Sequence, residues 1–257
     1  MGRVGVFVYG VVCYAMFLGV FLYSFGFVTG WWVPKTIDSP RVTVSMWISI
    51  AANLGLLVVF GLQHSVMARP TFKRWWTRII PPAAERSTYV LMSNLCLIAL
   101  FIAWQPLPMI VWDVHNAAGR TALWALCIAG WLMVLISTFL INHFDLFGLR
   151  QVWLHFRGRE YTHLPFGTPL FYKHIRHPLY VGWITAFWAT PTMTLGHLFF
   201  AAITTLYIVV AIFFEERNLV EHFGERYEAY RRGTGKFIPR LRPQTTQSHP
   251  AATIEPV

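Results

Sequence analysis

The beginning of the chain constrains the fold most, because an uncharged apolar run fills it. Val4 to Val33 contains no Asp, Glu, Lys, Arg or His. A transmembrane helix needs about 20 apolar residues, and the apolar core of a cleaved signal peptide is shorter. We therefore expect an uncleaved first transmembrane helix. The composition agrees, since 12% of the residues are charged, against about 25% in ordinary soluble domains.

Further apolar runs predict an all-α integral membrane protein with about six transmembrane helices. The predicted spans are Val6–Val28, Val44–Gln63, Tyr89–Trp104, Ala122–Ile141, Leu179–Ala189 and Leu195–Phe214. The fifth is too short to cross a bilayer untilted, and Pro191 and Gly196 break the apolar block there. We therefore predict that the fifth and sixth spans form a helical hairpin, which brings His177 and Glu215 to one membrane face.

The distribution of basic residues predicts the orientation. With a cytoplasmic N-terminus and six spans, eighteen of the 21 Lys and Arg residues fall in inner segments, and only Lys35, Arg41 and Arg120 lie outside. The positive-inside rule then places both termini in the cytoplasm. The net charge of +10 is explained by this topology and by anionic lipid head groups, so it does not indicate nucleic-acid binding.

The domain organisation is predicted to be simple. Residues 1–243 form a single membrane-embedded domain that ends in a cytoplasmic helix. Residues 244–257, rich in Pro, Thr, Ser and Ala, are expected to be a disordered tail. No internal repeat is visible, which argues against a transporter.

The first polar motif is Gln63-His64-Ser65, at the end of the second span. A histidine near the membrane face can bind haem or a metal, or it can hydrogen-bond to a neighbouring helix. Because no second ligand follows at helical spacing, we favour the structural role for His64 and predict no metal site.

The second polar motif, Ile141 to Trp153, directly follows the fourth span. In a turn, Asp145 could orient His143 as a base that acts near neutral pH, and Arg150 is a nearby cation. Alternatively, the Asn and Asp of this motif cap a helix.

The third polar group flanks the predicted hairpin. Arg176, His177 and Tyr180 open it, and His177 precedes a proline that can begin a helix. Glu215 and Glu216 close it at a helix C-terminus, where the helix dipole opposes carboxylates by about 0.3–1 kcal/mol. The pair therefore needs a compensating cation, either an arginine or a bound one.

These residues carry a resemblance to a known family. R-H-P-x-Y-x-G at Arg176–Gly182, followed by E-E-x-x-L-V-x-x-F-G-x-x-Y-x-x-Y from Glu215, resembles the isoprenylcysteine carboxyl methyltransferase and phospholipid methyltransferase group. The runs Gln63–Trp76, Ile141–Trp153 and Tyr161–Trp183 are similar to bacterial members that methylate methanethiol to dimethyl sulfide. The upstream half also resembles membrane proteins associated with nitric-oxide reductase, some of whose relatives are haem-dependent isomerases.

The resemblance implies an inner-membrane enzyme that transfers a methyl group from S-adenosyl-L-methionine to a small thiol. It implies that a region at about 160–238 binds the cofactor through Tyr172, His177, Tyr180, Glu215 and Glu216. Carboxylates and aromatic faces suit the cofactor's ammonium and sulfonium groups.

We expect the thiol to be activated at the same face. His143 is the predicted base, and Arg150 or Arg176 the predicted stabiliser of the thiolate. The alternatives are a prenylcysteine or phospholipid acceptor, and a haem-binding isomerase that uses His64.

Overall fold

Helices make up nearly all of the regular structure in the computed structural model, which describes residues 2–39, 44–162 and 167–240. The α-helices are α1 (Arg3–Thr29), α2 (Met46–Met67), α3 (Pro70–Trp76), α4 (Glu85–Ala103), α5 (Ala117–Ile141), α6 (His143–Leu146), α7 (Leu149–Phe156), α8 (Pro178–Trp188), α9 (Leu195–Phe223) and α10 (Glu225–Gly233). Two 3₁₀ turns, η1 (Pro82–Ala84) and η2 (Leu170–Lys173), precede α4 and α8. The predicted tail, 244–257, lies outside the described residues.

Five helices, α1, α2, α4 (together with η1), α5 and α9, are long and apolar enough to cross a membrane. The prediction of an all-α integral membrane protein is confirmed. α1 ends at Gly30, whose φ of 79° is a left-handed conformation that glycine adopts without steric cost. The remaining predicted span, α8, has 11 residues and is about 16 Å long. It therefore crosses only part of a hydrocarbon core of about 30 Å.

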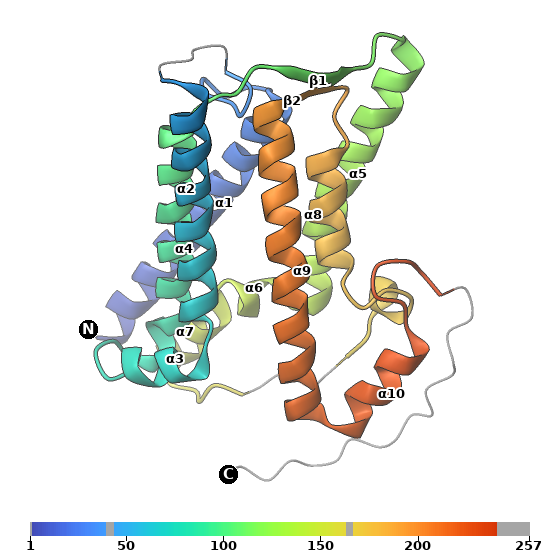
Figure 1. The fold of residues 1–257 in the computed structure, drawn as a ribbon. Coiled ribbons are helices and arrows are strands. Elements are labelled where there is room, and N and C mark those ends of the chain that lie inside the picture. Colours follow the sequence, from blue (N-terminus) through green and yellow to red (C-terminus); the bar gives the residue numbers. More distant parts are fainter. Residues whose placement is uncertain (1, 40–43, 163–166, 241–257) are drawn as a thin grey trace.

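The predicted hairpin of the last two spans is confirmed. The helical conformation is interrupted between α8 and α9, where the chain reverses direction, and the two helices lie side by side (Figure 1). The Trp188 indole N–H donates to Thr205 Oγ1 at 2.9 Å across this contact. Two short strands, which the sequence did not predict, lie at the end of the bundle where α8 connects to α9. β1 (Ile110–Asp113) pairs antiparallel with β2 (Thr192–Thr194).

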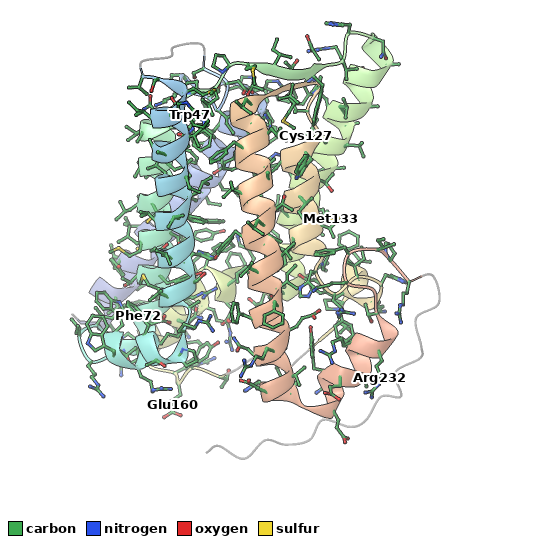
Figure 2. All side chains as sticks on the ribbon, viewed as in Figure 1. Trp47, Phe72, Cys127, Met133, Glu160 and Arg232 are labelled. Carbon is green, nitrogen blue, oxygen red and sulfur yellow. The ribbon has the colours of Figure 1, made fainter. Side chains whose placement is uncertain are left out.

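Polar elements gather at the opposite end of the bundle, which we call the charged end. It contains α3, α7, α10 and the start of α1 (Figure 1). Figure 2 shows Glu160 and Arg232 at this end, whereas Trp47 lies at the end of the bundle that carries the sheet. The start of α1 and the helix after the last span thus share one end, as the predicted topology requires.

Two facing glycines bring α5 and α8 into close contact. A Cβ atom on Gly130 would lie 2.6 Å from the Ala186 backbone nitrogen, and one on Gly182 would lie 2.8 Å from the Gly130 carbonyl oxygen. Small residues allow helix backbones in membranes to approach in this way. Since α5 and α8 are antiparallel, the contact sets the end of α5 beside the beginning of α8.

Gly130→Ala should therefore destabilise the protein by about 1–3 kcal/mol, because its methyl group would overlap backbone atoms of α8. Thermal unfolding in detergent checks this. Gly55→Ala, in α2, is the matched control, since a Cβ there meets nothing within 4 Å. Equal unfolding temperatures for the two variants would contradict the prediction.

Candidate active site at the charged end

Glu216 holds together three segments at the charged end. Arg176 Nε donates to Glu216 Oε1 at 2.8 Å, and His177 Nε2 lies 3.0 Å from the same oxygen. Both partners are almost fully shielded from solvent. Arg176 Nη1 also donates to the Arg231 carbonyl at 3.0 Å and to that of Thr234. The expected compensating cation for Glu216 is thus Arg176, and the pair joins α8, α9 and α10.

Glu215 is arranged differently from its neighbour. Its Oε2 atom is buried and has no hydrogen-bond partner among the described residues. His177 Nδ1 lies 3.8 Å from this oxygen, beyond hydrogen-bonding distance. A buried carboxylate oxygen without a partner is costly. Glu215 therefore offers a free acceptor to a cationic ligand.

Tyrosine side chains surround this free acceptor. Tyr180, on α8, and Tyr172, in η2, both interact with the Glu215 carboxylate. Burial, and secondly Glu215, raises the pKa of Tyr172 above its usual value of 10.0, so the phenol stays protonated. The Tyr230 hydroxyl on α10 donates to the Tyr172 carbonyl at 2.6 Å, which fixes η2 against α10. All five predicted cofactor residues, Tyr172, His177, Tyr180, Glu215 and Glu216, thus lie in one cluster.

His143, the predicted base, is buried immediately after α5. Thr138 donates its hydroxyl proton to the Leu135 carbonyl at 2.7 Å, so its oxygen accepts from His143 Nδ1 at 2.9 Å. The other ring nitrogen, Nε2, then accepts from the Tyr14 hydroxyl at 2.8 Å. Phe139 stacks on the imidazole with ring centroids 4.2 Å apart. Burial lowers the pKa of His143, so the neutral base predominates at pH 7.

The predicted pairing of Asp145 with His143 is wrong, because hydroxyl groups occupy both imidazole nitrogens. Asp145 instead accepts from Arg150 Nη1 at 3.0 Å and from the Tyr161 hydroxyl at 3.2 Å. Arg150 is therefore neutralised by a carboxylate. Asn142 has the alternative role of a helix cap: it precedes α6, and its side chain accepts from the Asp145 backbone N–H at 3.1 Å.

His64, on α2, has the same type of hydrogen-bonded environment as His143. Ser93 donates to the Tyr89 carbonyl at 3.0 Å, so its oxygen accepts from His64 Nδ1 at 3.3 Å. His64 Nε2 accepts from the Tyr89 hydroxyl at 2.8 Å. These are the hydrogen bonds to a neighbouring helix that the favoured structural role requires. With both nitrogens engaged, His64 offers none to a haem iron in this arrangement.

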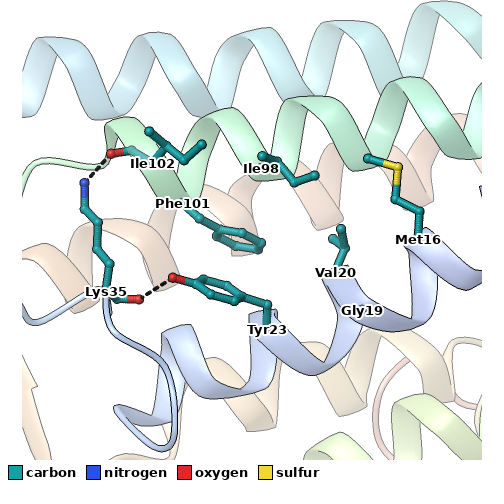
Figure 3. Close-up of a pocket in the computed structure, with 8 residues that line it drawn as sticks. All are labelled: Met16, Gly19, Val20, Tyr23, Lys35, Ile98, Phe101 and Ile102. Atoms are coloured by element: carbon teal, nitrogen blue, oxygen red, sulfur yellow. Dashed lines mark hydrogen bonds between the residues drawn. The ribbon is translucent and has the colours of Figure 1, made fainter.

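A groove among the described residues lies elsewhere. It has a volume of about 520 Å³ and runs between α1 and α4 (Figure 3). Its lining contains one charged side chain, Lys35, and one phenol, Tyr23. Without a carboxylate or imidazole, this groove does not suit a cationic ligand, and the charged end remains the candidate active site.

Sequence reasoning missed the tyrosines that complete these clusters. Tyr14 and Tyr89 lie within apolar runs, where an aromatic residue usually indicates only packing or an interface. Their hydroxyl groups gave the one available signal, since a buried phenol needs a hydrogen-bond partner. Arg86, counted only as a basic residue in an inner segment, contacts Tyr89 and the Leu146 carbonyl.

The fold and this site define an integral membrane protein with a carboxylate–arginine–histidine site at one end of a helical bundle. The chain is 52% identical over 239 residues to Methanethiol S-methyltransferase of Crocosphaera subtropica, with 93% of each chain covered. It is 50% identical to Methanethiol S-methyltransferase of Mycobacterium tuberculosis over 90% of this chain and 95% of that one. It is 30% identical to Nurim of Sus scrofa over 68% of this chain and 70% of that one.

The chain therefore belongs to the methanethiol S-methyltransferase family and is a methyltransferase. The resemblance inferred from its motifs is confirmed. An enzyme of this class takes a methyl group from a donor. No protein-family model matches the chain, and no solved structure matches it.

The pKa of His143 predicts a pH effect on stability. The folded-state pKa is lowered from 6.5 by burial, so between the two values the unfolded chain binds more protons. Stability is then complete above about pH 6.5 and is lost as the pH falls toward the folded-state pKa. Thermal midpoints between pH 5 and 8 should decline less steeply for His143→Asn than for the unsubstituted protein. Identical slopes would contradict this.

Proposed function

We propose that the protein transfers a methyl group from S-adenosyl-L-methionine to methanethiol, giving dimethyl sulfide. The observation that carries this proposal is the buried Oε2 of Glu215, which has no hydrogen-bond partner among the described residues and is surrounded by tyrosines, in a chain of this family. When bound, S-adenosyl-L-methionine supplies an electrophilic methyl group on a cationic sulfur. The donor also has an ammonium group and ribose hydroxyls.

The residues of the cluster fit such a donor. Glu215 Oε2 can accept from the ammonium group, and the rings of Tyr172 and Tyr180 can face a cationic centre. Glu216 cannot replace Glu215, because Arg176 and His177 already occupy its Oε1 atom. We assign Glu215 to donor binding and Glu216 to positioning, within a cofactor-binding part at about 160–238 of a single domain, 1–243.

The acceptor needs deprotonation, since a thiol such as that of cysteine has a pKa of about 8.5. We assign His143 as the base, acting through Tyr14. The thiol proton passes to the Tyr14 oxygen while the phenol proton passes to His143 Nε2, 2.8 Å away. A new sulfur–carbon bond then forms as the donor's methyl–sulfur bond breaks, with its electron pair left on the donor sulfur. Orienting two small reactants in a site shielded from water supplies much of the rate.

We place the charged end at the cytoplasmic face of a bacterial inner membrane. The eighteen-to-three distribution of basic residues supports both termini on that side. A water-soluble donor would then reach the cluster directly, and a small apolar thiol can arrive from either phase.

Purified protein given methyl-labelled S-adenosyl-L-methionine and methanethiol should release labelled dimethyl sulfide, detected by gas chromatography with mass spectrometry. His143→Ala should lose turnover but still bind the donor. A preparation that binds the donor yet methylates only a prenylcysteine or a phospholipid would refute the proposed acceptor.

The two neighbouring glutamates should respond differently to substitution. Glu215→Gln should weaken donor binding at least 10-fold with little change in thermal stability, because its Oε2 has no hydrogen-bond partner among the described residues. Glu216→Gln should lower both the affinity for the donor and the thermal stability, since breaking a buried ion pair costs about 3–5 kcal/mol. Isothermal titration with S-adenosyl-L-methionine and thermal unfolding separate the two effects. Equal losses of stability would refute the assigned roles.

A further inference from the structure

Arg86, at the start of α4, is a half-buried arginine with no carboxylate partner among the residues that the structure describes. Its Nε donates to the Leu146 carbonyl at 2.7 Å, and its guanidinium carbon lies 4.7 Å from the centre of the Tyr89 ring. Arg150 and Arg176, the arginines expected to stabilise a thiolate, each bind a carboxylate instead. A charge without a counter-ion in a membrane protein is costly and indicates a function.

Arg86 lies between the two parts of the candidate active site. Leu146 is the last residue of α6, the short helix that begins at His143. On the other side, Tyr89 is close enough to Tyr180 for the two phenols to interact electrostatically, and Tyr180 interacts in turn with Glu215. The guanidinium thus hydrogen-bonds to the helix that begins at the proposed base, and it contacts Tyr89, which interacts with the cluster proposed to bind the donor.

The position of Arg86 is fixed by close packing. Gly148, which follows α6, has a φ of 90°, and a Cβ there would lie 2.8 Å from the Ser87 backbone nitrogen. The turn after α6 therefore packs directly against the residue next to Arg86. The bond to Leu146 uses only Nε, and within the described part of the chain neither Nη group has a hydrogen-bond partner. The four N–H groups of Nη1 and Nη2 are therefore available to an anion.

We propose that Arg86 is a catalytic residue that binds and stabilises the thiolate sulfur of the methyl acceptor, an inference that rests on the proposed function. The thiol's proton goes to the Tyr14–His143 pair, and the sulfur retains its electron pair beside the guanidinium until it attacks the methyl carbon. Two titratable groups on other elements interact electrostatically with Arg86, the His64 imidazole and the Tyr161 phenol. Asp145, next to Leu146 in sequence, is the carboxylate close to this region, and it pairs with Arg150 and accepts from Tyr161. Neither Asp145 nor Glu85, on the same helix, forms an ion pair with Arg86 among the described residues.

Arg86→Gln removes the charge but keeps an N–H donor for the Leu146 carbonyl. At pH 7 its kcat/KM for methanethiol should fall about 10²–10³-fold, the usual loss when one group that stabilises a developing charge is removed. Activity should rise with pH toward 9, where a larger fraction of the free thiol is ionised in solution. Arg86→Lys should keep the charge and the original pH profile. Binding of S-adenosyl-L-methionine should be unchanged in both variants.

Arg78→Gln is the matched control, because Arg78 is an exposed arginine of the same end and should keep full activity. A folded Arg86→Gln variant with the original kcat/KM and pH profile would overturn the inference. The unsubstituted protein gives a test without substitution at Arg86. Thiocyanate, a small sulfur anion, should inhibit it competitively against methanethiol, and failure to compete would also overturn the inference.

The outcomes separate this inference from the proposed function. If the unsubstituted protein forms no dimethyl sulfide, the proposed function is wrong. If it is active and Arg86→Gln is equally active, only the role of Arg86 is wrong.

Discussion

The cost of placing charge in hydrocarbon determines how this structure is arranged. Glu216 lies within α9, where the apolar part of the helix ends; the helix continues to Phe223, so the predicted helix C-terminus at the glutamates is wrong. Glu216 is stable there because Arg176 and His177 bind the same carboxylate oxygen. Through this oxygen, Glu216 on α9 is bound to the residues that precede α8. Arg176 also binds α10, so the three helices are held together at one end of the bundle. Once Glu216 is neutralised, the adjacent Glu215 is left with an unpartnered oxygen that can be used for binding.

The second constraint is the close approach of α5 and α8. Their facing glycines, Gly130 and Gly182, let the backbones touch, so the short helix α8 is held against a full transmembrane helix. Because the two helices are antiparallel, His143 follows the end of one near the point where His177 begins the other. The proposed base and the carboxylate cluster therefore share one end of the bundle.

Local patterns predicted much of this arrangement. Apolar length alone predicted the spans, because hydrocarbon thickness fixes how many residues a helix needs. The break near Pro191 predicted the hairpin, and the resulting geometry predicted that His177 and the glutamates would meet. The pairing of Asp145 with His143 was wrong, because proximity in sequence does not decide which donors face a buried ring. The partners of His143 are Thr138 and Tyr14, and Tyr14 is on a distant helix.

The sequence by itself determined that the chain is a helical membrane protein, and its motifs determined the family and the residues that form the carboxylate cluster. Periodicity, apolar length and charge are local properties that each segment carries independently of its neighbours. Only the tertiary structure decided that Glu216 is neutralised while Glu215 keeps an oxygen without a hydrogen-bond partner, and that Arg86, unlike Arg150 and Arg176, has no carboxylate partner among the described residues. Those outcomes depend on atomic distances between helices far apart in the chain, and no single segment specifies such distances.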